Sequence, residues 1–215
     1  MKIVPMSLSV VLLVSLFIPS AQAAWNWKEQ LQKFTKPLAT KSLSDTQIGA
    51  GLKEALSQGI DRAVYLAGHD GGYNNNPAIR IKFPDQVTAM TNMLKKMGLG
   101  RQIEDFEFNV NRAAEQAAPS AKKILLDALF AMNIEDAQKL LKGGETAATD
   151  YFKSKTWSQL DAAFKPVIQK AMNQYGAADK YNRLVTVYNS IPVPQKPALA
   201  NAEDYATTKA LDGLF

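Results

Sequence analysis

The sequence predicts an all-α fold: a single irregular bundle of about eight helices with one short extended segment. The first observation is that apolar residues recur three and four residues apart through most of the chain after residue 44. The second is that Ser, Thr, Asn, Gly and Pro stand where these segments begin and end. The third is that only residues 78–84 alternate with period two, while heptad runs and internal repeats are missing.

A cleaved signal peptide is predicted at residues 1–23. Lys2 precedes an apolar run at residues 8–18, and the Ala-x-Ala of residues 21–23 is typical of a secretory cleavage site. This run is shorter than the roughly 20 apolar residues that a transmembrane helix needs, so an uncleaved membrane anchor is the less favoured alternative. We therefore expect a periplasmic mature protein that begins at Ala24.

The composition narrows the possible functions. The chain has no cysteine, which excludes a disulfide, thiol catalysis, cysteine metal sites and a lipoprotein anchor. The net charge of +5 includes Lys2, so the expected mature chain carries +4, with its basic residues scattered among acids. This pattern indicates solubility and at most a weak preference for anionic surfaces. No basic run is interleaved with aromatics, so no nucleic-acid partner is expected, and no later segment is apolar enough to span a membrane.

Residues 24–43 are predicted to form a polar N-terminal arm, and residues 44–215 a single all-α domain. The arm carries Trp25 and Trp27 and is interpreted as a short helix or a loosely docked tail that is broken near Pro37. The two tryptophans are candidate anchors at a membrane interface. Docking of one or both onto the body of the protein is the favoured interpretation.

A first long helix is predicted from Ser44, whose pairing with Gln47 forms a capping box, to about Gly68. Residues 68–77 are rich in Gly and Asn and predict a loop. The only histidine of the chain, His69, lies in this loop, where a catalytic base would lack a fixed position. We therefore interpret the loop as structural, with a place in the mouth of a ligand site as the alternative.

The extended segment at residues 78–84 is expected to lie across the helices with Ile79, Ile81 and Phe83 pointing inward. The helix that follows Pro84 is expected to end at the glycines of residues 98–100. It carries three methionines on one face, which form a candidate apolar cleft for a ligand or, alternatively, fill a core. These methionines are Met90, Met93 and Met97.

The helix predicted at residues 102–118 has two different faces. One is an apolar stripe that includes Phe106 and Val110, and the other combines three acids with one amide. The members of this second stripe are Glu104, Glu107, Asn111 and Glu115. Phe108 lies inside this acidic stripe and Arg112 borders it. Because solvated faces rarely place a phenylalanine among acids, we expect this helix to be covered on more than one side.

The remaining chain predicts six further helices and a proline-rich connection. A second capping box at Thr156–Gln159 is expected to separate two of these helices, and Pro166 is expected to kink the second. The expected helices cover residues 119–132, 133–143, 145–155, 157–175, 178–188 and, after the proline segment at 191–197, residues 203–211.

The favoured interpretation of the charged residues is a partly buried polar network that fixes the register of the helices. Buried ions are retained when they are paired and hydrogen-bonded, and one arginine among acids and amides satisfies this condition. The network is expected to combine the second stripe with two residues of the later Thr-Asp-Tyr-Phe segment. Its predicted members are Glu107, Asn111, Arg112, Glu115, Asp150 and Tyr151.

A catalytic interpretation uses the same carboxylates. Glu107 and Glu115, with Asp127 and Asp150 brought close by folding, would perform acid–base hydrolysis of cell-wall material. No nucleophile–base pair accompanies them, so catalysis is the alternative and not the expectation. No cofactor is expected, and no metal either, because the chain lacks cysteine and the alternating acidic ligands of a calcium loop.

Three strings of the sequence are specific enough to suggest a family. Together with residues 51–56 and 209–215, the segments 76–84, 106–115 and 143–152 resemble the signature segments of the bacterial domain-of-unknown-function family 4197. The resemblance implies an exported helical protein and carries no activity with it. We expect a non-catalytic binding or interaction protein of the cell envelope, with an unknown partner or a lipid-like or peptide ligand.

Overall fold

The computed structural model describes residues 44–83, 88–190, 192 and 201–215, with the backbone alone at Asp45 and residues 88–90. The predicted signal peptide and N-terminal arm lie outside the described residues. So does the predicted proline segment, apart from Pro192, which is exposed.

The described elements are all helical, so the predicted all-α class is confirmed. No strand occurs among the described residues, and residues 80–82 of the predicted extended segment belong to neither a helix nor a strand. The elements are α2 (Asp45–Gly68), α3 (Thr88–Leu94), the π-helical turn η2 (Lys95–Leu99), α4 (Gly100–Ala117), the 3₁₀ turn η3 (Ala118–Ser120), α5 (Ala121–Phe130), α6 (Ile134–Lys142), α7 (Ala147–Gln174), α8 (Ala177–Ser190) and α9 (Ala202–Leu214).

The predicted number of helices is not supported. The elements α3, η2, α4, η3 and α5 follow one another without an intervening residue, so the described chain forms six uninterrupted helical stretches. Gly98, with a φ of 83°, turns the chain between α3 and α4 without a separate loop. Pro119 lies in the single turn η3 between α4 and α5, so this proline bounds both helices without a gap between them.

The second predicted capping box is wrong, because α7 continues through it. The Thr156 side chain is buried, and its hydroxyl donates a hydrogen bond of 2.7 Å to the carbonyl of Phe152. A threonine inside a helix uses this carbonyl, four residues back, where an N-cap would use a later amide. The segments expected at 145–155 and 157–175 are therefore one helix, and Pro166 lies inside it.

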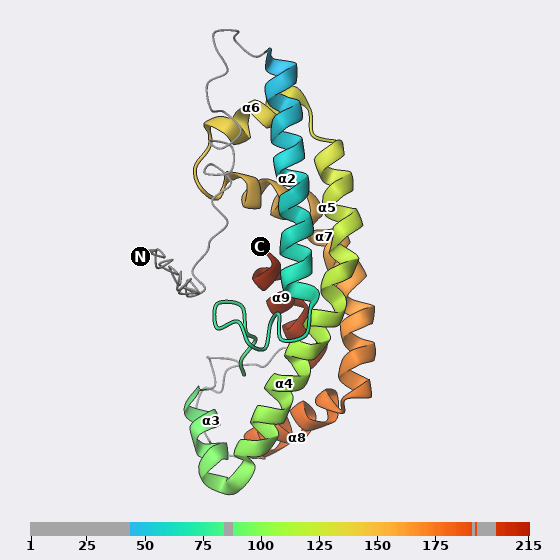
Figure 1. Cartoon of the computed structure of the whole chain (residues 1–215). Coiled ribbons are helices and arrows are strands. Elements are labelled where there is room, and N and C mark those ends of the chain that lie inside the picture. Colours follow the sequence, from blue (N-terminus) through green and yellow to red (C-terminus); the bar gives the residue numbers. More distant parts are fainter. Residues whose placement is uncertain (1–43, 84–87, 191, 193–200) are drawn as a thin grey trace, which may run out of the picture.

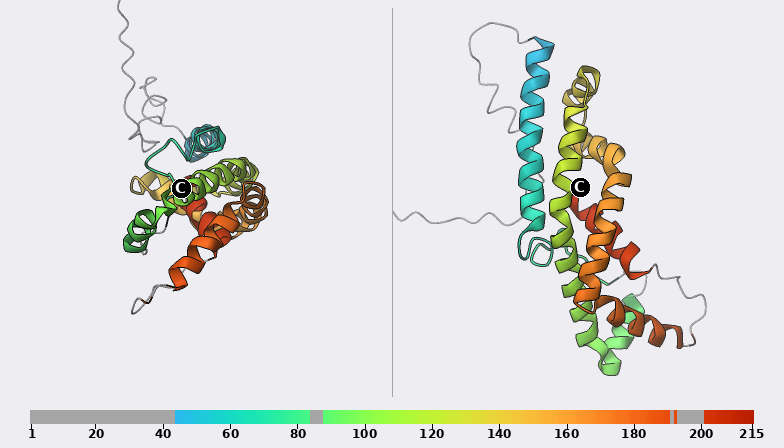
Figure 2. Two further views of the ribbon diagram at one scale, coloured as in Figure 1. Left: turned by 90° about the horizontal axis from the view of Figure 1, so that it is seen from below. Right: turned by 90° about the vertical axis from the view of Figure 1, so that its right-hand side faces the viewer.

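Three long helical stretches give the molecule its elongated shape (Figure 1). The helix α2, the rod formed by α4 and α5, and α7 run side by side in alternating directions, as both side views show (Figures 1 and 2). The short helix α6 lies at the end where α2 begins, and α3 and α8 lie at the opposite end. The helix α9 packs between these stretches, chiefly against α7, and its Ala206, Ala210 and Leu211 are fully buried.

The core is continuous along the molecule. Its largest fully buried side chains include Phe106 of α4 and Phe164 of α7. Phe83 meets Phe106 edge to face at a centroid distance of 5.5 Å, and both rings contact Tyr181 of α8. The inward orientation predicted for the apolar side chains of residues 79–83 is thus confirmed, because Ile81 and Phe83 are buried and Ile79 packs against the core. Within the described ranges, no helix is both long and apolar enough to cross a bilayer.

Candidate functional site

Three side chains of α4 bind the main chain of residues 70–83. Glu107, Asn111 and Glu115, which we call the polar stripe, stand four residues apart and therefore share one face of the helix. The chain leaves α2 at Gly68, turns back, and runs over this face. The stripe supplies hydrogen-bond partners for main-chain groups of a segment that is neither helix nor sheet.

Asn111 occupies the centre of the polar stripe and is fully buried. Its Oδ1 accepts a hydrogen bond of 2.8 Å from the backbone N–H of Ile81, and its Nδ2 donates one of 2.7 Å to the carbonyl of the same residue. The Nδ2 group also donates to the carbonyl of Glu107, again at 2.7 Å. An asparagine side chain thus pairs with Ile81 as a neighbouring strand would, using both its donor and its acceptor.

Glu115 is a buried carboxylate, only 2% exposed, whose charge is compensated. Its Oε1 accepts hydrogen bonds from the backbone N–H groups of Tyr73 and Asn74, at 3.2 and 3.1 Å. Its Oε2 accepts one of 2.8 Å from Nη1 of Arg112. Buried charges persist only with such partners, so this glutamate serves as an acceptor for the folded loop.

Arg112 joins the loop to the buried end of the polar stripe. Its Nη1 donates to Asp70 at 2.6 Å as well as to Glu115. The hydrogen bond to Asp70 is the main reason that the pKa of Arg112 is raised, with smaller contributions from Glu115. Because the Asp70 side chain is 90% exposed, this half of the interaction is accessible to water, whereas the Glu115 half is enclosed.

Glu107 holds the far end of the same segment. Its Oε1 accepts a hydrogen bond of 2.9 Å from the backbone N–H of Phe83, and its Oε2 lies 3.6 Å from Nη2 of Arg80. On the opposite side, the hydroxyl of Tyr205 in α9 donates to the carbonyl of Lys82 at 2.8 Å. Residues 80–83 are therefore fixed between α4 and α9.

The loop at residues 68–77 is organised around Tyr73, which sequence reasoning missed. Its side chain is fully buried, and its hydroxyl donates a hydrogen bond of 2.6 Å to the carbonyl of Ala210 in α9. Burial, and to a lesser degree the charge of Glu115, raises the pKa of Tyr73. The turn before it requires glycine, because a Cβ at Gly72 would lie 2.4 Å from the carbonyl oxygen of Leu66. The sequence feature that could have indicated this role is a single tyrosine within a Gly/Asn-rich segment.

The structure does not bring Asp150 and Tyr151 to the polar stripe, so the predicted network is wrong in these two members. Asp150 accepts a hydrogen bond from Thr146, and Tyr151 lies near Asp136 of α6; burial first, and then this carboxylate, raises the pKa of Tyr151. The reason is the length of α7. Its C-terminal end contacts α4, where the carbonyl of Tyr175 accepts a hydrogen bond from Asn109. Asp150 lies near the other end of α7, about 37 Å from Tyr175 along the helix axis.

The other singled-out residues lie on the surface. Phe108 is 50% exposed, so the enclosure inferred from it is wrong at that side chain; segment 70–83 covers the polar stripe instead. Met93 and Met97 are 40% and 55% exposed, and the side chain of Met90 lies outside the described part. Asp127, proposed for the hydrolase, accepts a hydrogen bond from Lys123 on the exposed side of α5. No group of three metal-ligating side chains occurs among the described residues.

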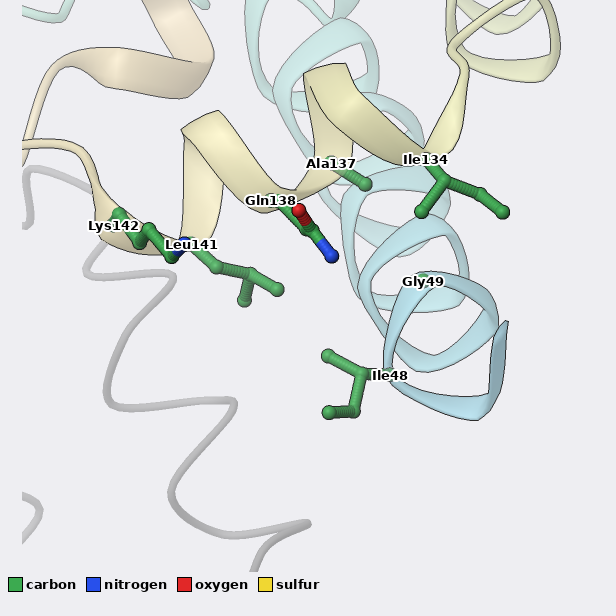
Figure 3. Close-up of a pocket in the computed structure, with 7 residues that line it drawn as sticks. All are labelled: Ile48, Gly49, Ile134, Ala137, Gln138, Leu141 and Lys142. Carbon is green, nitrogen blue, oxygen red and sulfur yellow. The ribbon is translucent and has the colours of Figure 1, made fainter. Parts of the chain in front are cut away.

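A groove of about 200 Å³ lies between the start of α2 and α6 (Figure 3). Ile48 and Leu141 point into it from the two helices, with Gln138 between them. Ile48 and Ile134 are 37% and 52% exposed, although both are large apolar residues. The full lining is Ile48, Gly49, Ile134, Ala137, Gln138, Leu141 and Lys142. We call it the α2/α6 groove.

A further exposed apolar residue lies at the end of α5. Phe130, the last residue of α5, is 65% exposed, and its carbonyl accepts a hydrogen bond of 3.1 Å from Nζ of Lys53 in α2. This bond holds α2 against the turn that leads to α6. The sequence indicates no functional role for Gly49 or Ile134, because each lies in an otherwise ordinary helical pattern.

A second hollow, of about 570 Å³, lies between α4 and α7 and is more open to solvent. Its lining is Gln116, Pro166, Val167, Lys170 and Gln174. Gln116 also donates a hydrogen bond to the hydroxyl of Tyr175. Three of these five lining residues are polar, compared with two of seven in the α2/α6 groove, so the α2/α6 groove is the stronger candidate for a binding site.

Comparison with known proteins gives a family and no further relative. The model of a protein family described as "Protein of unknown function (DUF4197)" matches residues 42–215. No curated protein and no solved structure matches the chain.

Proposed function

Because this chain belongs to the DUF4197 family, whose function is unknown, we propose its function from its own residues: it is an exported, non-catalytic binding protein of the cell envelope. Its α2/α6 groove takes apolar side chains from a segment of a partner protein. The observation that carries the proposal is the exposure of Ile48 and Ile134 around one apolar groove. Single exposed apolar residues are ordinary, whereas a contiguous apolar surface marks a site of interaction.

The size of the groove favours a peptide over a lipid-like ligand. Its volume of about 200 Å³ is below the range of about 300–1,000 Å³ that encloses drug-sized ligands. Two or three apolar side chains fit such a space while the rest of their segment lies across the exposed side of Ile134. An amphipathic helix presents side chains in this way, three and four residues apart.

The contacts of the polar stripe favour binding over the hydrolase alternative. The two carboxylates of that hypothesis that lie on α4 already accept hydrogen bonds from the main chain: Glu107 from Phe83, and Glu115 from Tyr73 and Asn74. A general acid or base needs access to its substrate. Using Glu115 in this way would require opening the loop that it holds.

Export is tested by expressing the full chain in a bacterium and separating the periplasm from the cytoplasm. We expect the protein in the periplasmic fraction, with a mass that corresponds to a chain beginning at Ala24. Protein that keeps residues 1–23 and stays in the cytoplasm would contradict the proposed compartment.

The binding function is tested on the exported protein with a synthetic helical peptide that carries Leu and Phe at positions i, i+3, i+4 and i+7. Fluorescence anisotropy of the labelled peptide should show saturable binding, which Ile134→Asp abolishes because it places a charge at the groove. The matched control is Phe108→Asp, at a similarly exposed apolar residue of α4. Equal binding of a scrambled peptide, or equal binding by the Ile134→Asp protein, would refute the proposal.

A further inference from the structure

We propose that the chain's own N-terminal arm, residues 24–43, docks in the α2/α6 groove and competes there with the partner segment. The inference rests on the proposed function, because it assigns a regulator to the same groove. It starts from the connection of the chain. The arm ends at Leu43, and the groove begins one turn into α2, at Ile48 and Gly49.

The sequence of the arm fits the groove. Trp27, Leu31 and Phe34 stand four and three residues apart, the spacing that places three side chains on one face of a helix. The residues between them are polar or charged. The arm therefore has the pattern that the proposed function requires of a partner, a short apolar row on a polar segment.

The length of the connection allows the arm to reach back. Residues 35–44 separate Phe34 from the start of α2, and this many residues span at most about 35 Å. Pro37 stands within this connection, and because a proline does not continue a helix, the proposal includes a change of chain direction after Phe34.

Tethering decides between the arm and a second copy of the protein as the occupant. A segment held by a short flexible linker meets its site at an effective concentration on the order of millimolar. A second copy at micromolar concentration would need an affinity about a thousandfold tighter to compete equally. The arm therefore occupies the groove of its own chain even when its affinity for the groove is too weak to form a dimer with a second copy.

The first test uses arm tryptophans as reporters in the exported protein. Trp157 is the only other tryptophan, so the Trp157→Phe background restricts fluorescence to Trp25 and Trp27. We expect blue-shifted emission and reduced quenching by acrylamide relative to the denatured protein, both independent of protein concentration. If acrylamide quenches the arm tryptophans as strongly as in the denatured protein, the inference is overturned. Protection that appears only as the protein concentration rises would overturn it too, because it would mean that a second copy of the protein supplies the contact.

Two glycine substitutions in this background locate the docking site. Gly49 lines the groove and Gly51 does not, and a Cβ at either position meets nothing within 4 Å. Leucine should therefore raise the melting temperature at both, since it favours a helix over glycine. Only Gly49→Leu fills the groove, so only this variant should expose the arm tryptophans. An equal response of both variants, or of neither, would overturn the inference.

The second test separates the inference from the proposed function. Replacing Trp27, Leu31 and Phe34 together by serine should free the groove and tighten binding of the synthetic peptide. If the arm occupies the groove nine-tenths of the time, the gain is about tenfold. Unchanged peptide affinity with exposed arm tryptophans means that the inference fails while the function stands. Absence of peptide binding even in the triple variant means that the proposed function fails.

Discussion

The polar stripe of α4 and the α2/α6 groove differ in which groups they leave uncovered. At the stripe, charged and amide side chains are enclosed, and Asn111 and Glu115 are almost completely buried. At the groove, Ile48 and Ile134 are exposed although they are apolar. The residues that most suggest chemistry in the sequence thus stabilise the fold, and the residues that suggest ordinary core packing form the open surface.

The difference has a physical cause. Residues 80–82 lie in no helix or strand, so their main-chain groups need partners from elsewhere in the protein. The side chains of the polar stripe provide these partners. At the groove, Ile134 is 52% exposed, so we expect a serine at this position to leave the stability of the fold almost unchanged. Exposure of several apolar residues along one groove, without such a structural reason, favours a binding surface.

The largest expected effect is at Glu115. In Glu115→Ala, the backbone N–H groups of Tyr73 and Asn74 lose their acceptor, and Arg112 loses its enclosed partner. Removing one partner from a buried, hydrogen-bonded ion pair lowers the free energy of unfolding by about 3 kcal/mol. Urea denaturation followed by circular dichroism measures this change.

The matched control for that experiment is Glu104→Ala, because Glu104 lies on the same helix and is exposed. Its free energy of unfolding should stay within about 0.5 kcal/mol of the wild-type value. A loss below about 1 kcal/mol in Glu115→Ala would break the comparison, since it would mean that the loop is held without this carboxylate.

Tyr73 gives a second, pH-dependent prediction. Its raised pKa means that the folded protein keeps the phenol proton above pH 10, where the unfolded chain loses it. Stability that depends on this proton is complete below pH 10 and falls by about 1.4 kcal/mol for each pH unit above it. The Tyr73→Phe variant does not lose stability in this way at high pH. At neutral pH its free energy of unfolding is lower than that of the wild type by about 1 kcal/mol, because it cannot form the hydrogen bond to Ala210.

Denaturation at pH 8 and at pH 11 therefore should show the wild-type advantage over Tyr73→Phe shrinking or reversing. The exposed Tyr65 provides the control, because Tyr65→Phe should follow the wild-type protein at both pH values. A constant difference between wild type and Tyr73→Phe would show that the Tyr73 hydroxyl reaches water, and that the loop is not closed over the polar stripe.

Local signals explain which parts of this fold were predictable. The capping box of Ser44 and Gln47 is present at the start of α2, and Asn133 caps α6 through the N–H of Asp136. Each of these interactions spans three residues, so the sequence contains both partners within one short window. The same kind of short window gave a wrong capping box at Thr156, whose hydroxyl donates its hydrogen bond to the carbonyl of Phe152 instead.

Contacts between distant residues explain what was not predictable. The polar stripe was recognised from its spacing, but its partners at Tyr73 and Ile81 lie 42 and 30 residues away along the chain. Helical periodicity shows which residues share a face and carries no information about what covers that face. Asp150 was assigned to the polar stripe for the same reason, and prediction of the groove would have required the relative position of two helices.

The smallest expected effect on stability is at Ile134, and it sharpens the comparison most. If the exposed isoleucine serves binding only, Ile134→Ser should change the free energy of unfolding by at most about 0.5 kcal/mol, as for most surface substitutions. Ala137, one turn further on α6, is 2% exposed and provides the contrast, because Ala137→Ser buries a hydroxyl at a cost of about 1–3 kcal/mol. Urea denaturation of both variants measures the difference. A loss at Ile134 as large as that at Ala137 would place Ile134 in the structural contact between α2 and α6, and the groove would no longer be a free surface.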